Sequence, residues 1–170
     1  DTDSQVQLED GQIAWQSLLR YDCMYRKLDP ATGEVRYSFE EVPEEQGGRN
    51  HLLSLIAEAG RGAEFSELVC FGEKLLAMDD RTGLICEIRD GHKLIPRNIL
   101  ITGSGDEKFK GFKAEWATLK DNQLIVGSHG RVETDEAGNP KTGELEWVKV
   151  IDWDYRIQSI DWHDRYEAMR

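Results

Sequence analysis

The chain has 170 residues, of which 21 are lysine or arginine and 33 are aspartate or glutamate, giving a formal net charge of −12. This acidity argues against unaided binding to nucleic acid or to an anionic membrane, because proteins bind both through basic residues. Length predicts one domain with one core, no apolar run approaches the roughly 18 residues of a membrane span, and three cysteines are too few for a disulfide framework.

The first third of the chain contains one strong hairpin signal. Asp29-Pro30-Ala31-Thr32-Gly33 is turn chemistry between two β-rich runs, residues 23–28 and 34–39. Residues 12–19 fit a strand or a short helix, and residues 51–57 fit a strand or a helical turn. The acidic, glycine-bearing stretch 40–49 predicts an exposed loop.

Four short β-rich runs follow and are separated by turn signals such as Gly72-Glu73 and Asp90-Gly91. Four strands of about five residues within about 36 residues predict an antiparallel meander rather than βαβ units. The predicted strands are residues 66–71, 74–79, 84–88 and 93–102.

The pattern then repeats. Residues 66–77 can be laid over 115–126 with an offset of 49, which aligns the turn and the second strand of each segment. A period of about 40–50 residues with four strands per unit is typical of a β-propeller blade. An ordinary β-sandwich with evenly spaced hairpins is the alternative.

The last part of the chain continues the β pattern. Residues 143–150 and 156–162 predict strands, the turn-rich stretch 133–142 predicts a long loop, and residues 161–169 predict a short terminal helix. The sequence therefore predicts an all-β fold whose blade-like units span about 12–60, 64–102 and 112–163.

Several common catalytic motifs are absent from the sequence. There is no P-loop, Gly103-Ser104-Gly105 lacks the third glycine of a dinucleotide-binding turn, and the four histidines show no metal-binding spacing. Cys70 and Cys86 fall on the first and third strands of one unit, which are not neighbours. We therefore expect buried free thiols rather than a disulfide.

Carboxylates at strand ends are the remaining candidates for chemistry. Residues 79–83 have the sequence of a turn in which a carboxylate caps main-chain N–H groups. Glu115 begins an apolar strand, so it must be paired or metal-bound if it points inward. Ser66 is its equivalent in the repeat, and the inner strands of a propeller converge on a central channel. Oxygen ligands from successive blades would suit Ca²⁺.

Four blocks of residues stand out by their order and spacing: residues 60–68, 79–83, 111–116 and 146–150. In both respects they resemble the soluble calcium-activated nucleotidases, a family of apyrases. The match covers nearly the whole chain, most weakly between about 4 and 55, and Asp1-Thr2-Asp3-Ser4 is similar to the family's Asp-x-Asp opening. The resemblance implies a five-bladed propeller that holds Ca²⁺ in its channel and hydrolyses nucleoside di- and triphosphates.

The resemblance also implies roles for individual residues. One of the carboxylates would orient or deprotonate the attacking water, and the cations would neutralise phosphate oxygens. The metal ligands are Ser66 and Glu115, the catalytic carboxylates are Asp1, Asp3 and Asp80, and the substrate-binding residues are Arg81, Lys113, Arg131 and Glu64.

Three positions depart from the family pattern or leave alternatives open. Arg131 stands where family members carry a lysine, and Glu133 replaces a family aromatic residue, so nucleotide preference stays open. Glu64 could fix Arg61 or Lys113, or it could be a solvated carboxylate at a strand edge.

Two functions stay open. The first is a Ca²⁺-dependent nucleotidase that uses metal-assisted attack of water, which Asp80-Arg81 and Lys113-x-Glu115 favour. The second is a non-catalytic Ca²⁺-binding propeller fragment that serves as an interaction module. The resemblance implies a nucleotide substrate and a secreted or ER/Golgi-lumenal location, and a homodimer is an open alternative.

Length conflicts with this architecture. At about 49 residues per blade, even four blades need about 196 residues, and propellers close with roughly four to eight blades. We therefore expect the N-terminal half of an apyrase ring, completed by the remaining half from the same or another chain. Asp1-Thr2-Asp3, without methionine or a signal pattern, is consistent with a processed or cut chain.

Overall fold

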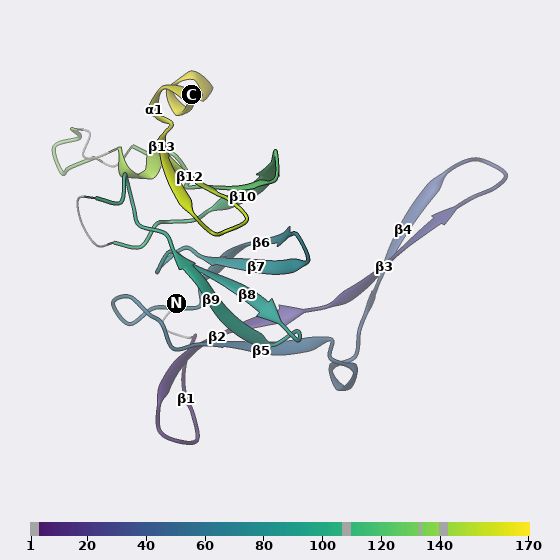
Figure 1. The fold of residues 1–170 in the computed structure, drawn as a ribbon. Helices are drawn as coiled ribbons and strands as arrows, with labels where there is room; N and C mark the ends of the chain where they lie inside the picture. Colours follow the sequence, from purple (N-terminus) through teal and green to yellow (C-terminus); the bar gives the residue numbers. More distant parts are fainter. Residues whose placement is uncertain (1–3, 107–109, 133, 140–142) are drawn as a thin grey trace.

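The computed structural model describes residues 4–106, 110–132, 134–139 and 143–170, and within them it confirms an all-β fold (Figure 1). Thirteen strands in these ranges form four antiparallel sheets, and one short α-helix closes the chain. The elements are β1 (Gln5–Gln7), β2 (Ile13–Arg20), β3 (Asp22–Leu28), β4 (Val35–Glu41), the 3₁₀ helix η2 (Glu44–Gln46), β5 (Arg49–Ser54), β6 (Phe65–Phe71), β7 (Lys74–Asp79), β8 (Leu84–Arg89), β9 (Lys93–Ile99), β10 (Trp116–Lys120), β11 (Gln123–Gly127), the 3₁₀ helix η3 (Glu144–Glu146), β12 (Trp147–Ile151), β13 (Ile157–Asp161) and α1 (His163–Met169).

Strands β6–β9 form the middle sheet, in which each strand pairs antiparallel with the next. This confirms the predicted meander. The last strand is shorter than the expected 93–102 and ends at Ile99. The main chain leaves the sheet there, and the Thr102 N–H donates to the Lys110 carbonyl (2.9 Å) instead of to β8.

Strands β10–β13 form a second meander of the same order. Its first hairpin pairs Lys120 with Gln123, and the middle sheet pairs Phe71 with Lys74, so the two hairpins match at the predicted offset of 49. The expected strand at 143–150 is wrong at its start. Three residues form η3 instead, and β12 begins at Trp147.

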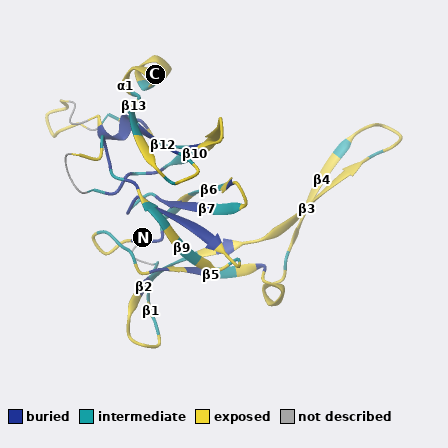
Figure 2. Cartoon of the chain, viewed as in Figure 1, coloured by how far each residue is buried: buried dark blue, intermediate teal, exposed yellow. Residues whose placement is uncertain are grey.

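The N-terminal residues build a three-stranded sheet, β1-β2-β5, and a separate two-stranded ribbon, β3–β4. Both segments whose type was open, 12–19 and 51–57, contain strands. The ribbon confirms the hairpin around Asp29–Gly33, and it projects away from the sheets with almost every residue exposed (Figures 1 and 2). Residues 40–49 are exposed at most positions, as expected, although they include the end of β4 and η2.

The middle sheet has a hydrophobic core on each face. Because side chains alternate along a strand, neighbouring residues of β7 enter different cores. Ala77 packs with Leu19 and Leu52 of the N-terminal sheet, whereas Leu76 and Met78 pack toward the second meander. The buried members of this larger core are Phe71, Leu76, Met78, Ile85, Leu100, Phe112, Ala114, Leu124, Val126 and Ile151.

All three cysteines are free, and no disulfide joins Cys70 to Cys86. Cys86 is buried, as expected. Cys70 is exposed, which corrects the expectation of a buried thiol. It lies on the outward-facing side of β6, an edge strand of the middle sheet.

A buried lysine ties the connector between the two meanders to the second sheet. Lys149 on β12 is 1% exposed, and its Nζ donates to the Gly103 carbonyl (2.5 Å) and to Ser159 Oγ (2.8 Å). Burial lowers the pKa of Lys149 to about 8. This contact holds the connector at Gly103 against the second sheet.

Among the residues that the structure describes, no helix has the length and apolar character needed to cross a bilayer.

Replacement of Gly83 should test how closely the sheet connections pack. Gly83 has φ +73°, and an added Cβ would lie 2.1 Å from the Leu100 carbonyl oxygen and 2.7 Å from the Phe112 nitrogen. We expect Gly83→Ala to lower the free energy of unfolding by more than about 2 kcal/mol, because strain and a main-chain clash add.

Gly33→Ala is the matched control, since Gly33 has the same φ and no atom within 4 Å of the added Cβ. It should cost only about 1 kcal/mol in chemical denaturation. Equal losses for the two variants would contradict close packing at Gly83.

Candidate functional site

Asp79, at the end of β7, holds two loops together. Its side chain is completely buried, and it accepts main-chain N–H groups from Ala63 (3.0 Å), Arg81 (2.8 Å) and Thr82 (3.2 Å). This confirms the predicted capping turn and identifies Asp79 as the capping residue. The neighbouring Asp80 is thereby left to face the site.

The loop before β6 carries an arginine–glutamate pair. Arg61 donates to both carboxylate oxygens of Glu64, at 2.7 and 2.5 Å. Of the alternatives left open for Glu64, the structure therefore selects pairing with Arg61 and not with Lys113. The hydrogen bonds from Arg61 hold the pKa of Glu64 down to about 2, against the opposing effect of burial.

Lys113 joins two of the predicted site carboxylates. Its Nζ lies 2.6 Å from Asp80 Oδ2 and 2.5 Å from Glu115 Oε1, although these residues come from different sheets and connectors. Partial burial disfavours the ammonium, but the hydrogen bonds to the two carboxylates outweigh it and raise the pKa of Lys113. Lys113 therefore stays positively charged at neutral pH.

Ser66 lies beside this group. It occupies an irregular step in the pairing of β6 with β7, and its hydroxyl donates to the Ala114 carbonyl, next to Glu115. Strands β6 and β10 thus bring the two predicted metal ligands to the same junction between the sheets.

Arg81 contacts Glu58, a residue that the sequence analysis did not identify. Its Nε donates to the Glu58 carbonyl (3.4 Å), and its guanidinium lies 3.7 Å from Glu58 Oε1. The sequence signal that could have identified Glu58 is its position three residues before Arg61, in the same glycine-containing loop. Glu58 restrains Arg81 near the Arg61–Glu64 pair.

The remaining predicted residues are not brought into this group. Arg131 is exposed on the turn after β11, and its main-chain N–H donates to His129 Nδ1 (3.0 Å). Asp1, Asp3 and Glu133 lie outside the described residues.

The oxygen atoms at Ser66 and Glu115 are of the chemical type that binds calcium. A hydroxyl, a carboxylate and the adjacent Ala114 carbonyl are hard oxygen ligands of the sort that Ca²⁺ prefers, and Ca²⁺ takes about six to eight of them. Lys113 contacts the Glu115 carboxylate here, so calcium binding would require Lys113 to move or to share that carboxylate. The other ligands would come from outside this junction, including from water and phosphate.

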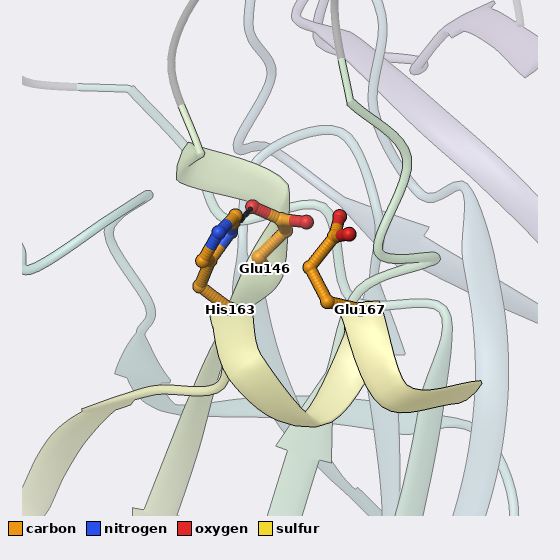
Figure 3. A group of neighbouring side chains, drawn as sticks. All are labelled: Glu146, His163 and Glu167. Atoms are coloured by element: carbon orange, nitrogen blue, oxygen red, sulfur yellow. Dashed lines mark hydrogen bonds and ion pairs between the residues drawn. The ribbon is translucent and has the colours of Figure 1, made fainter. Parts of the chain in front are cut away.

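A second cluster lies at α1 (Figure 3). Glu146, His163 and Glu167 place their ligand atoms within 4.8 Å of one another, an arrangement that could hold a metal ion. Arg170, however, donates to Glu146 (2.7 Å) and to Glu167. The chain thus supplies its own cation to both carboxylates, so we interpret the cluster as an ion-pair network.

Comparison with known proteins identifies relatives of this chain. A family model described as Apyrase matches residues 1–170. Soluble calcium-activated nucleotidase 1 of Rattus norvegicus is 37% identical over 170 residues, which are 100% of this chain and 39% of the rat protein. Apyrase of Cimex lectularius is 40% identical over 126 residues, or 74% of this chain and 34% of that protein. Apyrase apy-1 of Caenorhabditis elegans is 32% identical over 169 residues, or 99% of this chain and 45% of that protein. The chain therefore spans less than half the length of these relatives.

Replacement of Arg61 should raise the pKa of the Glu64 carboxyl. The lowered pKa stabilises the fold fully above the ordinary value of 4.5, and this contribution is lost as pH falls toward about 2. In Arg61→Gln we expect the pKa of Glu64 to rise toward 4.5 and the pH-dependent contribution to shrink, as followed by carboxyl ¹³C NMR titration.

Arg36→Gln is the control, because it removes an equal charge from the exposed Arg36–Glu34 pair. It should leave Glu64 titrating at about 2. A Glu64 that still titrates there in Arg61→Gln would contradict the assigned cause.

Proposed function

The chain belongs to the apyrase family, and from that premise we propose that it is part of a Ca²⁺-dependent nucleotidase that hydrolyses terminal phosphates of nucleoside di- and triphosphates. The observation that carries this proposal is the bridge from Lys113 to Asp80 and Glu115 at the junction of two sheets. In a chain with a net charge of −12, this bridge holds a positive charge, which an anionic substrate would need for binding.

The cations of the site suit phosphoryl transfer. Charge develops on the equatorial phosphoryl oxygens during the reaction, and positioned cations stabilise it. Lys113 and Arg81 are each held by a carboxylate side chain, and we propose that they turn partly from Asp80 and Glu58 to the phosphate oxygens. Arg131 would add a third positive charge from its exposed turn.

Ser66 and Glu115 are the residues of this chain that would hold calcium. The chemistry that Ca²⁺ supplies when bound is polarisation of the phosphoryl oxygens. Attack by water also needs a carboxylate to orient it or accept its proton, and Asp1, Asp3 and Asp80 are the proposed group. Asp80 is favoured by its place beside Lys113.

We propose a five-bladed propeller for the whole protein. Two meanders related by an offset of 49, stacked on a third sheet, support blade-like units at about 12–60, 64–102 and 112–163. Leu18 and Leu53 lie on the outer face of the N-terminal sheet and are 56% and 42% exposed. These exposed leucines suit contact with a further blade, supplied by the rest of the ring from the same or another chain. A secreted or ER/Golgi-lumenal location is proposed from the family resemblance.

The proposed activity predicts calcium-stimulated phosphate release. The full-length protein should release phosphate from UDP, GDP or ADP at least about tenfold faster with Ca²⁺ than with a chelator, because cation loss removes stabilisation of the transferring phosphoryl group. Absence of stimulation for all three nucleotides, in a folded protein, would favour the non-catalytic calcium-binding module.

The proposed ligand role of Glu115 makes a separate prediction. Glu115→Ala should weaken Ca²⁺ binding at least about tenfold and reduce the calcium-induced rise in thermal stability by an amount equivalent to about 1.4 kcal/mol. Glu34→Ala, at an exposed carboxylate on the ribbon, should keep the full rise. An unchanged rise in Glu115→Ala would count against the ligand assignment.

A further inference from the structure

The turn after β11, residues 128–131, carries Arg131 and packs directly against α1. Gly130 is buried in this turn at φ +64°, and a Cβ added to it would lie 2.3 Å from the Tyr166 ring. The turn therefore fits closely against one face of the helix.

Hydrogen bonds fix the main chain of the turn on both sides of His129. The Tyr166 hydroxyl donates to the Ser128 carbonyl (2.8 Å), and the Gly130 N–H donates to the Leu145 carbonyl (3.1 Å). The Arg170 guanidinium donates to the Gly130 carbonyl, immediately before Arg131.

Arg170 is itself held by a buried charge. The side chain of Glu146 is 2% exposed, and its two oxygens contact Arg170 (2.7 Å) and His163 (2.8 Å). A buried carboxylate that loses its partner is strongly destabilising, so Glu146 restrains Arg170 in place. The same guanidinium therefore connects a buried anion to the turn.

Arg131 needs such support to bind a ligand with a defined geometry. Among the described residues its side chain has no hydrogen bond or ion pair, so only the main chain fixes its direction. A flexible guanidinium loses conformational entropy when it binds phosphate, and a fixed main chain reduces that loss.

We propose that Glu146 and Arg170, aided by Tyr166, form a clamp that positions Arg131 toward the nucleotide phosphates. This inference rests on the proposed function and deepens it, because it assigns α1 a part in substrate binding. Arg170 is a positioning residue: it contacts Gly130 and acts through Arg131.

The first test is a double-mutant cycle in the full-length protein, with UDP as substrate. Arg170→Gln should raise KM about tenfold in the otherwise unchanged protein and less than about twofold when Arg131→Gln is also present. Arg170→Lys, which keeps the charge but not the planar fork, should restore part of the loss. An Arg170→Gln effect of equal size in both backgrounds would overturn the clamp.

Two further variants separate positioning from stability. Tyr166→Phe removes one hydroxyl while keeping the ring on Gly130, and it should raise KM by a smaller factor with kcat unchanged. Arg156→Gln removes the same charge from a 79% exposed side chain and should change neither constant. A Tyr166→Phe enzyme with an unchanged KM would count against the role of Tyr166.

Hydrogen exchange tests the clamp without any activity. Arg170→Gln should speed exchange of the Gly130 and Arg131 amides at least about tenfold relative to amides of the middle sheet. Unchanged exchange at Gly130 overturns the clamp whether or not the protein hydrolyses nucleotides. Loss of protection in a protein with no calcium-stimulated phosphate release would instead defeat the proposed function and leave the clamp as a mechanical feature.

Discussion

Asp79 accepts three main-chain N–H groups from a completely buried position, and the candidate site depends on this contact. One oxygen closes the turn at the end of β7, and the other reaches back to Ala63 in the loop before β6. A buried carboxylate without such donors would be strongly unfavourable, so the two loops are fixed together. This contact restricts where the side chains of the two loops can lie. Arg61 and Glu64 come from one loop, and Asp80 and Arg81 come from the other.

The electrostatics of the site follow from this arrangement. In a strongly acidic chain, Arg61, Arg81 and Lys113 each lie beside a carboxylate, and these contacts hold them in position. Pairing with Asp80 and Glu115 keeps Lys113 charged against partial burial. A phosphate could compete for these cations because the ion pairs are only partly buried, and partly solvated pairs exchange partners at modest cost.

Local features of the fold were predictable from the sequence, whereas contacts across long sequence separations were not. Turn residues such as Asp29–Gly33 favour hairpins through their own backbone preferences, so the antiparallel pairing of neighbouring strands could be predicted. The family resemblance gathered Ser66, Asp80, Lys113 and Glu115 into one site, and the structure shows how Lys113 links two of them. Neither route indicated that Arg170 would reach Glu146, because that pairing depends on how α1 packs against η3. The exposure of Cys70 was not predicted, because it also depends on packing between distant parts of the chain. The alternation of side chains along a strand does not show which face of an edge strand is covered by other elements.

The Lys113 bridge spans the boundary between two sheets, and this has a consequence for folding. Each meander consists of neighbouring antiparallel strands, so it can form early from contacts close in sequence. Asp80 and Glu115 come within reach of one ammonium only after the sheets have docked through the core around Phe112. The candidate site is therefore completed late in folding, and partial separation of the sheets would take it apart while most secondary structure survives.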